Sequence, residues 1–92
     1  MIRQTQEQAD PEMVAITALA FIAADPERLE RFLLLTGTQP ETIRLGARQP
    51  GFLSGVMQQV VGWEPWLLEF AAYAEMAPAD VVRAADRLAA ET

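Results

Sequence analysis

The sequence contains no cysteine, histidine, lysine or asparagine, and these absences narrow what the protein can do. Without cysteine it has no disulfide framework, no thiol nucleophile and no thiolate metal site. Without histidine it lacks the commonest metal ligand and the usual general base at neutral pH. A Gly-rich phosphate-binding loop is missing as well. We therefore predict that the protein is not an enzyme and holds no cofactor or metal.

Positive charge is also scarce. All seven basic residues are Arg, against thirteen Asp and Glu, and the formal net charge is −6. This balance favours solubility and opposes broad attraction to nucleic acid or to an anionic membrane. We therefore expect the partner to be a protein, either another chain or a second copy in a homodimer, and not a nucleic acid or a membrane.

The apolar run from Met13 to Ala24 has twelve residues, whereas a helix needs about 20 to span a bilayer. The segment before it carries Glu7, Asp10 and Glu12 against Arg3. This is the wrong sign of charge for a secretory signal. We therefore expect a buried helix at this run, in a cytoplasmic protein.

Six prolines, at positions 11, 26, 40, 50, 65 and 78, each stand where an amphipathic helix begins. Proline suits the first helical position, and the residue before it is held extended, as an N-cap is. Asp10 and Asp25 are good caps, and Gly37 is expected to end the second helix in a left-handed conformation. No stretch alternates with period two, as strands do. The pattern predicts six helices, over residues 11–24, 26–36, 40–47, 50–61, 65–75 and 78–90.

The predicted fold is all-α, a compact irregular bundle of five or six short helices, each started by a proline. Residues 1–9 are expected to be a disordered or frayed segment, and residues 10–92 to form a single helical domain. The helix over 26–36 is apolar nearly all round after Arg31, so we expect it at the centre, with Phe32 in the core.

The proline spacing also suggests an internal repeat. Pro11 and Pro50 are 39 residues apart, as are Pro26 and Pro65, while the third pair, 40 and 78, is 38 apart. This is the basis of a hypothesis that the bundle consists of two pseudo-symmetric three-helix halves. The alternative is that proline only marks helix starts and the spacing is chance.

Three stretches resemble a family of short bacterial all-helical proteins, the domain-of-unknown-function family 3572. They are ALAFIAADPERLERFLLLTGTQPETIR, QPGFLSGVMQQVV and LLEFAAYAEMAPADVVRAADRL, and together they cover about residues 13–90. The most telling parts are Asp25-Pro26-Glu27, Phe32 through Gly37 leading to Pro40, and Pro50-Gly51-Phe52-Leu53. These are structural signals. The resemblance implies a small helical protein with no known substrate, and it assigns no functional residue.

Four aromatic side chains, Trp63, Trp66, Phe70 and Tyr73, lie around Pro65. The last three are spaced three or four apart, so they share one helical face, and Trp63 could fold back onto them. One interpretation is core packing, because a small domain needs large aromatic side chains. The other is an interface anchor, because Trp and Tyr dominate binding hot spots. The sequence leaves both open.

Arg44 and Arg48 lie four apart and form either a candidate anion or DNA contact or an ordinary solvated helix face. A helix-turn-helix pattern is matched at three positions, Leu33, Gly37 and Ile43. Its recognition helix would be Pro40 to Arg48. The net charge of −6 opposes this hypothesis, because affinity for DNA depends heavily on phosphate neutralisation.

Paired carboxylates, Glu27 with Glu30 or Glu64 with Glu69, could be taken for an acid–base pair, but they lack helper residues. Glu27 fits better as an i,i+4 surface pair with Arg31. We therefore predict a protein-interaction or homo-oligomeric module without catalytic activity. The alternative is a DNA-binding regulator of the helix-turn-helix type, and a third possibility, an apolar-ligand binder, requires a pocket.

Overall fold

The computed structural model describes residues 10–46 and 50–91, and the side chains of all of these except residues 44–46 and 50. Within this part the chain forms helices and no strand. The helices are α2 (Pro11–Ala23), α3 (Pro26–Thr36), α4 (Pro40–Gly46), α5 (Pro50–Val61), α6 (Glu64–Ala74) and α7 (Pro78–Glu91). The predicted all-α fold is confirmed, and every predicted helix start agrees to within one residue. The predicted N-terminal segment, residues 1–9, lies outside the described residues.

Side-chain caps and one left-handed residue set the ends of the first two helices. The carboxylate of Asp10 accepts a hydrogen bond from the main-chain N–H of Glu12 at 3.1 Å, and that of Asp25 accepts one from Glu27 at 2.9 Å. Gly37 ends α3 with φ +70°, as predicted. These contacts satisfy main-chain groups that a helix leaves unpaired at its ends.

The ends of α6 depart slightly from the prediction. Trp63 takes the extended N-cap conformation, with φ −134° and ψ 113°, so the helix begins at Glu64 and Pro65 occupies its second position. The helix ends before Glu75, which is left-handed at φ 58° although it is not glycine. Its N–H donates to the carbonyl of Ala72 at 3.2 Å. The absence of a glycine here hid this stop signal from sequence reasoning.

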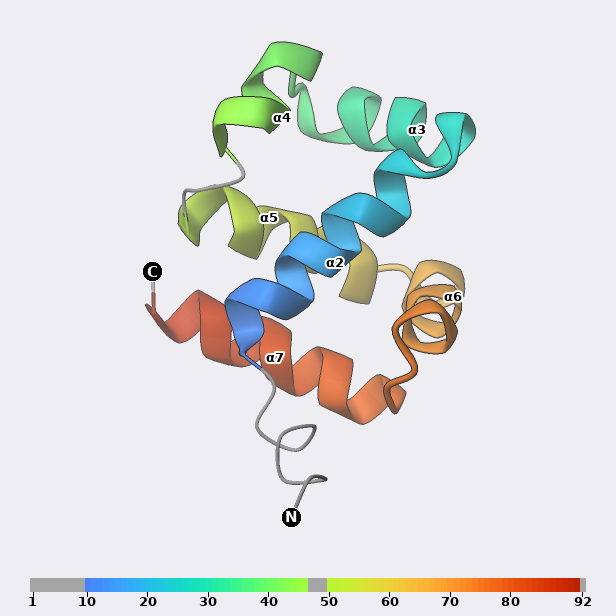
Figure 1. Ribbon diagram of the computed structural model, residues 1–92, viewed down its shortest axis with the longest axis vertical. Helices are drawn as coiled ribbons and strands as arrows, with labels where there is room; N and C mark the ends of the chain where they lie inside the picture. The colour runs from blue at the N-terminus through green and yellow to red at the C-terminus, as the bar shows by residue number, and fades with distance from the viewer. Residues whose placement is uncertain (1–9, 47–49, 92) are drawn as a thin grey trace.

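Most of the core comes from α2, α5 and α7, which pack against one another. Figure 1 shows α2 crossing the middle of the molecule, between α3 and α7. The buried hydrophobic side chains of these three helices are Val14, Ala15, Ala18, Leu19, Phe21, Ile22, Leu53, Val56, Met57, Val60, Val81, Ala84, Ala85 and Leu88. Among the described residues no polar or charged side chain is buried.

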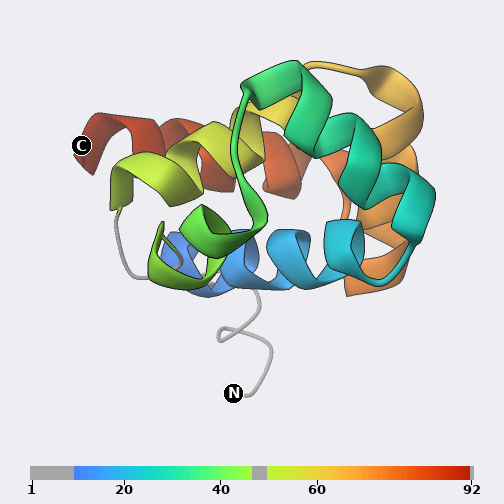
Figure 2. The ribbon, with the colours of Figure 1, turned by 90° about the horizontal axis from the view of Figure 1, so that it is seen from above.

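The helix at the centre is therefore α2, and our prediction that α3 would be central is wrong. Phe32 is buried, as predicted, but it is the one buried residue of α3. Leu29 and Leu33 are half-buried, whereas Leu34 and Leu35 are 77% and 61% exposed. Figure 2, seen from above, shows α3 lying on the outside of the bundle. A short helix buries only the face that meets its neighbour, so the apolar second half of α3 does not make the helix central.

The two proposed halves of the chain agree in part. The first pair of corresponding helices, α2 and α5, have 13 and 12 residues, and α3 and α6 have 11 each. In the third pair, however, α4 has 7 residues and α7 has 14. The hypothesis of two pseudo-symmetric halves stays a prediction.

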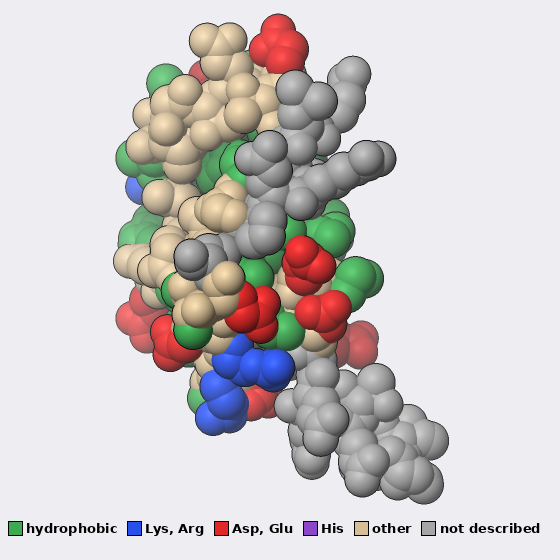
Figure 3. All heavy atoms as spheres, turned by 90° about the vertical axis from the view of Figure 1, so that its left-hand side faces the viewer, with side chains coloured by type: hydrophobic (Ala, Val, Ile, Leu, Met, Phe, Trp, Pro, Cys, Tyr) green, Lys and Arg blue, Asp and Glu red, His purple; other side chains and the backbone are tan. Residues whose placement is uncertain are grey.

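The surface is acidic and also exposes several large apolar side chains. Figure 3 shows acidic side chains spread over one face of the molecule, with hydrophobic side chains between them. The large hydrophobic residues that are exposed are Met13, Ile16, Leu34, Leu35, Trp63, Leu68, Tyr73 and Val82. None of the helices in the described part of the chain is both long and apolar enough to cross a membrane.

Candidate functional site

The structure divides the predicted aromatic cluster into a buried middle and two exposed ends. Trp66 and Phe70 belong to the core, while Trp63 is 42% exposed and Tyr73 is 51% exposed. The rings of Trp63 and Trp66 lie 6.0 Å apart between centroids, and those of Phe70 and Tyr73 lie 6.3 Å apart. Core packing therefore describes the middle pair, and only the end members are available to a partner.

Phe21 of α2 joins the two halves of this cluster. Its ring centroid lies 5.4 Å from those of Phe70 and Tyr73, and 6.4 Å from that of Trp66, at an edge-on angle of 88°. Such edge-to-face arrangements are the favoured geometry of aromatic pairs. Sequence reasoning missed this residue because Phe21 stands inside a long apolar run, where nothing in the local pattern distinguishes it.

Arg28 of α3 holds this junction together. Its Nε donates to the main-chain carbonyl of Phe21 at 3.0 Å, and its guanidinium carbon lies 4.0 Å from the centroid of the same residue's ring. Its Nη1 lies 3.5 Å from a carboxylate oxygen of Asp25 and 4.0 Å from one of Glu69. The side chain is only 22% exposed, so its polar contacts link α2, α3 and α6 at a partly buried position.

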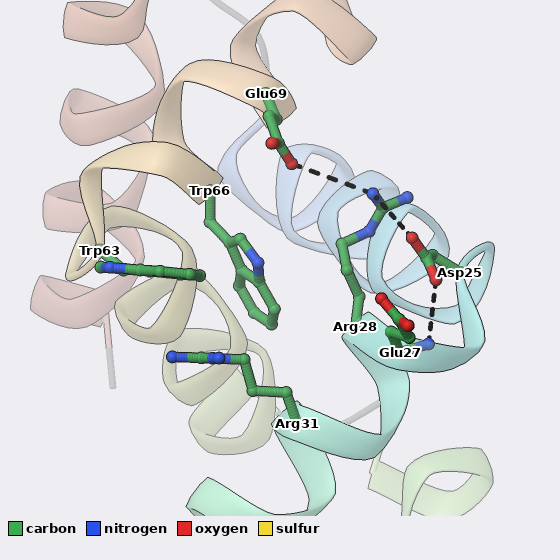
Figure 4. A pocket seen from close by; sticks show the side chains of 7 residues that line it. All are labelled: Asp25, Glu27, Arg28, Arg31, Trp63, Trp66 and Glu69. Atoms are coloured by element: carbon green, nitrogen blue, oxygen red, sulfur yellow. Dashed lines mark hydrogen bonds and ion pairs between the residues drawn. The ribbon is translucent and has the colours of Figure 1, made fainter.

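The second arginine of α3, Arg31, rests on Trp63. Its guanidinium carbon lies 4.2 Å from the centroid of the indole, and Figure 4 shows the guanidinium lying flat against that ring, with Trp66 beside it. We predicted an ion pair between Arg31 and Glu27, but no ion pair joins these two described residues. The exposed indole is a better partner because cation–π contact keeps the guanidinium edge in water.

These side chains surround a shallow cavity of about 290 Å³ (Figure 4). It is lined by Asp25, Glu27, Arg28, Arg31, Trp63, Trp66 and Glu69. Within the described residues no group of three or more His, Cys, Asp or Glu could hold a metal ion. The arrangement offers aromatic faces, guanidinium groups and carboxylates, which are suited to binding by stacking and charge.

A family model described as "Protein of unknown function (DUF3572)" matches residues 8–91. The chain belongs to this family. Comparison with curated proteins and with solved structures gives no match. Membership of the DUF3572 family confirms the resemblance noted in the sequence and assigns no activity to this chain.

A second hollow of the DUF3572 domain lies on the outer face of α3 and adjoins the first. Its volume is about 400 Å³, and it is lined by Glu27, Glu30, Arg31, Leu34 and Leu35. Glu27 and Arg31 line both hollows, so the outer face of α3 continues into the cavity beside Trp63. Of the predicted carboxylate pairs, one member of each, Glu27 and Glu69, lines the cavity beside Trp63.

The candidate DNA contact of the DUF3572 domain falls largely outside the described side chains. Arg48 is not among the described residues, and for Arg44 the structure describes only the backbone, within α4. Leu33 and Ile43 of the helix-turn-helix pattern are both half-buried, and Gly37 lies in the turn between α3 and α4. The DNA-binding alternative stays a prediction.

Proposed function

We propose that this protein is a protein-interaction module without catalytic activity, and that it binds through the outer face of α3. This face consists of the five residues that line the α3 hollow, namely Glu27, Glu30, Arg31, Leu34 and Leu35. They follow the spacing i, i+3, i+4, i+7, i+8, which is the spacing of a helix face that packs against a partner.

The observation that supports this proposal is the exposure of Leu34 and Leu35. Leaving a leucine in water forgoes about 1.5–3 kcal/mol of burial free energy. Here two adjacent leucines remain exposed at the end of a helix that packs on α2 through its opposite side. Contiguous apolar surface edged by charged residues is typical of an interaction site.

Trp63 extends this face onto α6. Its indole is partly exposed and supports the guanidinium of Arg31. Trp and Arg are the residue types most enriched in binding hot spots. Of the four aromatic residues predicted as an interaction surface, Trp63 is thus the one that adjoins the α3 face, while Tyr73 lies at the other end of the cluster.

The test is a comparison of two leucine variants with the wild type. Affinity capture from the native host would use the wild type, the Leu34→Ser/Leu35→Ser variant and the control Leu68→Ser, an exposed leucine of α6. We expect the partner to be retained by the wild type and the control, and the purified partner to bind the double variant at least about tenfold more weakly.

Circular dichroism would first establish that all three proteins are folded. Equal binding by the wild type and the double variant would show that α3 is not the interaction face. If the double variant and Leu68→Ser lost the same amount of partner binding, the loss would come from any leucine-to-serine change on the surface and not from the α3 face.

A further inference from the structure

The outer face of α3 carries charges of both signs, unpaired among the described residues, beside two exposed leucines. Arg31 stacks on Trp63, but its guanidinium has no carboxylate partner among the described residues. The carboxylates of Glu27 and Glu30 likewise lack an ion-pair partner there. Leu34 and Leu35 are uncovered. The face therefore offers a partner charges of both signs and an apolar surface within about two and a half turns of one helix.

The indole prepares Arg31 for binding. A guanidinium held flat on a ring keeps its N–H groups in the plane and pointing outward, where they match the geometry of a carboxylate. Because the stacking already restricts the long side chain, less side-chain entropy is lost when a partner's carboxylate arrives. Arg31 is thus a hydrogen-bond donor already positioned for an acidic side chain.

We infer that the occupant is a second copy of this chain, whose α3 packs antiparallel on the first. The inference deepens the proposed function and rests on it. A twofold axis through the middle of the face, between Arg31 and Leu34, places Leu34 over the aliphatic stem of Arg31 in the second copy. It also places each Arg31 about one helical turn, four residues along the axis, from Glu30 in the other copy.

Charge favours this occupant over a basic partner. A basic helix would form ion pairs with Glu27 and Glu30 but would place like charges against Arg31. An acidic helix would do the reverse. A second copy supplies both signs at once, since a twofold interface presents the same patch on both sides. The net charge of −6 on each chain opposes association. At physiological salt, however, exposed charges are screened beyond about 8–10 Å, so the Arg31–Glu30 pairs at the interface affect the association more than the net charge does.

The experiment is a charge exchange between two chains, followed by light scattering after size-exclusion chromatography at about 0.1–0.15 M salt, where the net charges are screened. The proteins are the full-length wild type, Arg31→Glu and Glu30→Arg, each measured alone, and an equimolar mixture of the two variants. Arg87→Glu, at an exposed position of α7, is the control with the same change of net charge as Arg31→Glu. In Figure 1, α7 lies at the end of the molecule away from α3.

We expect a dimeric mass for the wild type and for Arg87→Glu. Each of the other variants alone should dissociate at least about tenfold more readily, because like charges then meet across the axis. Mixing them should restore the dimer, since an all-acidic face then meets a basic one. If the variants were monomeric because they were misfolded, mixing would not restore the dimer, since each chain keeps its own substitution in the mixture.

Three outcomes would overturn the inference. They are a monomeric wild type at all concentrations, variants that remain dimeric on their own, and a mixture that stays monomeric while the wild type is dimeric. The first of these leaves the proposed function intact if Leu34→Ser/Leu35→Ser still loses a different protein. If that variant loses nothing either, the proposed function fails together with the inference.

Discussion

The guanidinium of Arg28 holds Phe21 at two points: Nε donates to its main-chain carbonyl at 3.0 Å, and the guanidinium carbon lies 4.0 Å from its ring centroid. That carbonyl is one of the last four of α2, which have no partner within the helix. The N–H groups of Ala24 and Asp25 pair with the carbonyls of Ala20 and Ile22. Arg28 thus completes the end of α2 from the next helix, and its charge suits the negative end of the helix dipole.

Replacing this arginine should destabilise the fold. Arg28→Met keeps the aliphatic stem but leaves the Phe21 carbonyl unpaired, so we expect the free energy of unfolding to fall by about 1–3 kcal/mol. The loss should persist at high salt, because the main contact is a hydrogen bond and the ion pairs to Asp25 and Glu69 are long. Urea denaturation at low and high salt measures both the loss of unfolding free energy and its dependence on salt.

Arg83→Met is the matched control for Arg28→Met. Arg83 pairs with Asp80 on an exposed face of α7, where such pairs contribute about 0–1 kcal/mol. Equal losses at the two positions would contradict the special role of Arg28.

The left-handed backbone at Gly37 predicts a strain that depends on residue type. An added Cβ meets no atom within 4 Å, so the cost of substitution comes from φ +70° alone. Gly37→Ala should lower stability by about 1–2 kcal/mol, and Gly37→Val by more, because a β-branched residue tolerates this conformation poorly. Thermal unfolding measures the change. A Gly37→Val variant as stable as the wild type would contradict the expectation.

Substitution of a second glycine, Gly55, should change stability in the opposite direction. Gly55 lies within α5 and its added Cβ also meets open space, but its φ is not positive. Gly55→Ala should therefore raise stability by about 0.4–1 kcal/mol, since alanine restricts the unfolded chain more than glycine does.

Phe32 and Leu34 test which side of α3 faces the core. Phe32→Ala removes the one buried side chain of this helix, so we expect a loss of about 3–5 kcal/mol. Leu34→Ala, two residues along, should change the stability of the single chain, measured at a concentration below that of any dimer, by no more than about 0.5 kcal/mol. Chemical denaturation of both variants gives the comparison. A loss below about 1 kcal/mol for Phe32→Ala would place that side chain outside the core.

The two tryptophans should behave differently. Trp66→Ala leaves a cavity in the core and should cost about 3–5 kcal/mol, whereas Trp63→Ala should cost only about 1 kcal/mol because its main contact is the exposed stacking with Arg31. Fluorescence quenching by acrylamide reports the difference directly. With Trp66→Phe the remaining indole should be quenched readily, and with Trp63→Phe it should be protected. Similar quenching of both would contradict the assigned burial.

Local chemistry explains how much of the fold was predictable. Three local signals could be recognised in the sequence: proline before an acidic first turn, aspartate before proline, and glycine after α3. All three act through neighbouring main-chain groups. Glu75 shows the limit of this reasoning, because its left-handed conformation is imposed on a residue type that seldom adopts it.

The site was less predictable than the fold. Trp63 was expected beside Trp66, and the two rings do meet. Arg31, however, was expected to pair with Glu27 on its own helix, and the better partner was an indole that is 32 residues away in the chain. Phe21 and Arg28 could not be found for the same reason, since each acquires its role from a contact between helices.

By itself, therefore, the sequence determines where each helix begins, to within one residue, and where α3 ends, because capping and proline geometry act over a few residues. Only the tertiary structure decides which apolar helix lies inside. Burial depends on which faces meet: α2 is apolar nearly all round, whereas α3 is apolar all round only after Arg31. Packing of α2 against α5 and α7 buries seven of its residues and leaves α3 covered on one side. The exposed leucines of α3, on which the proposed function depends, are a consequence of that packing.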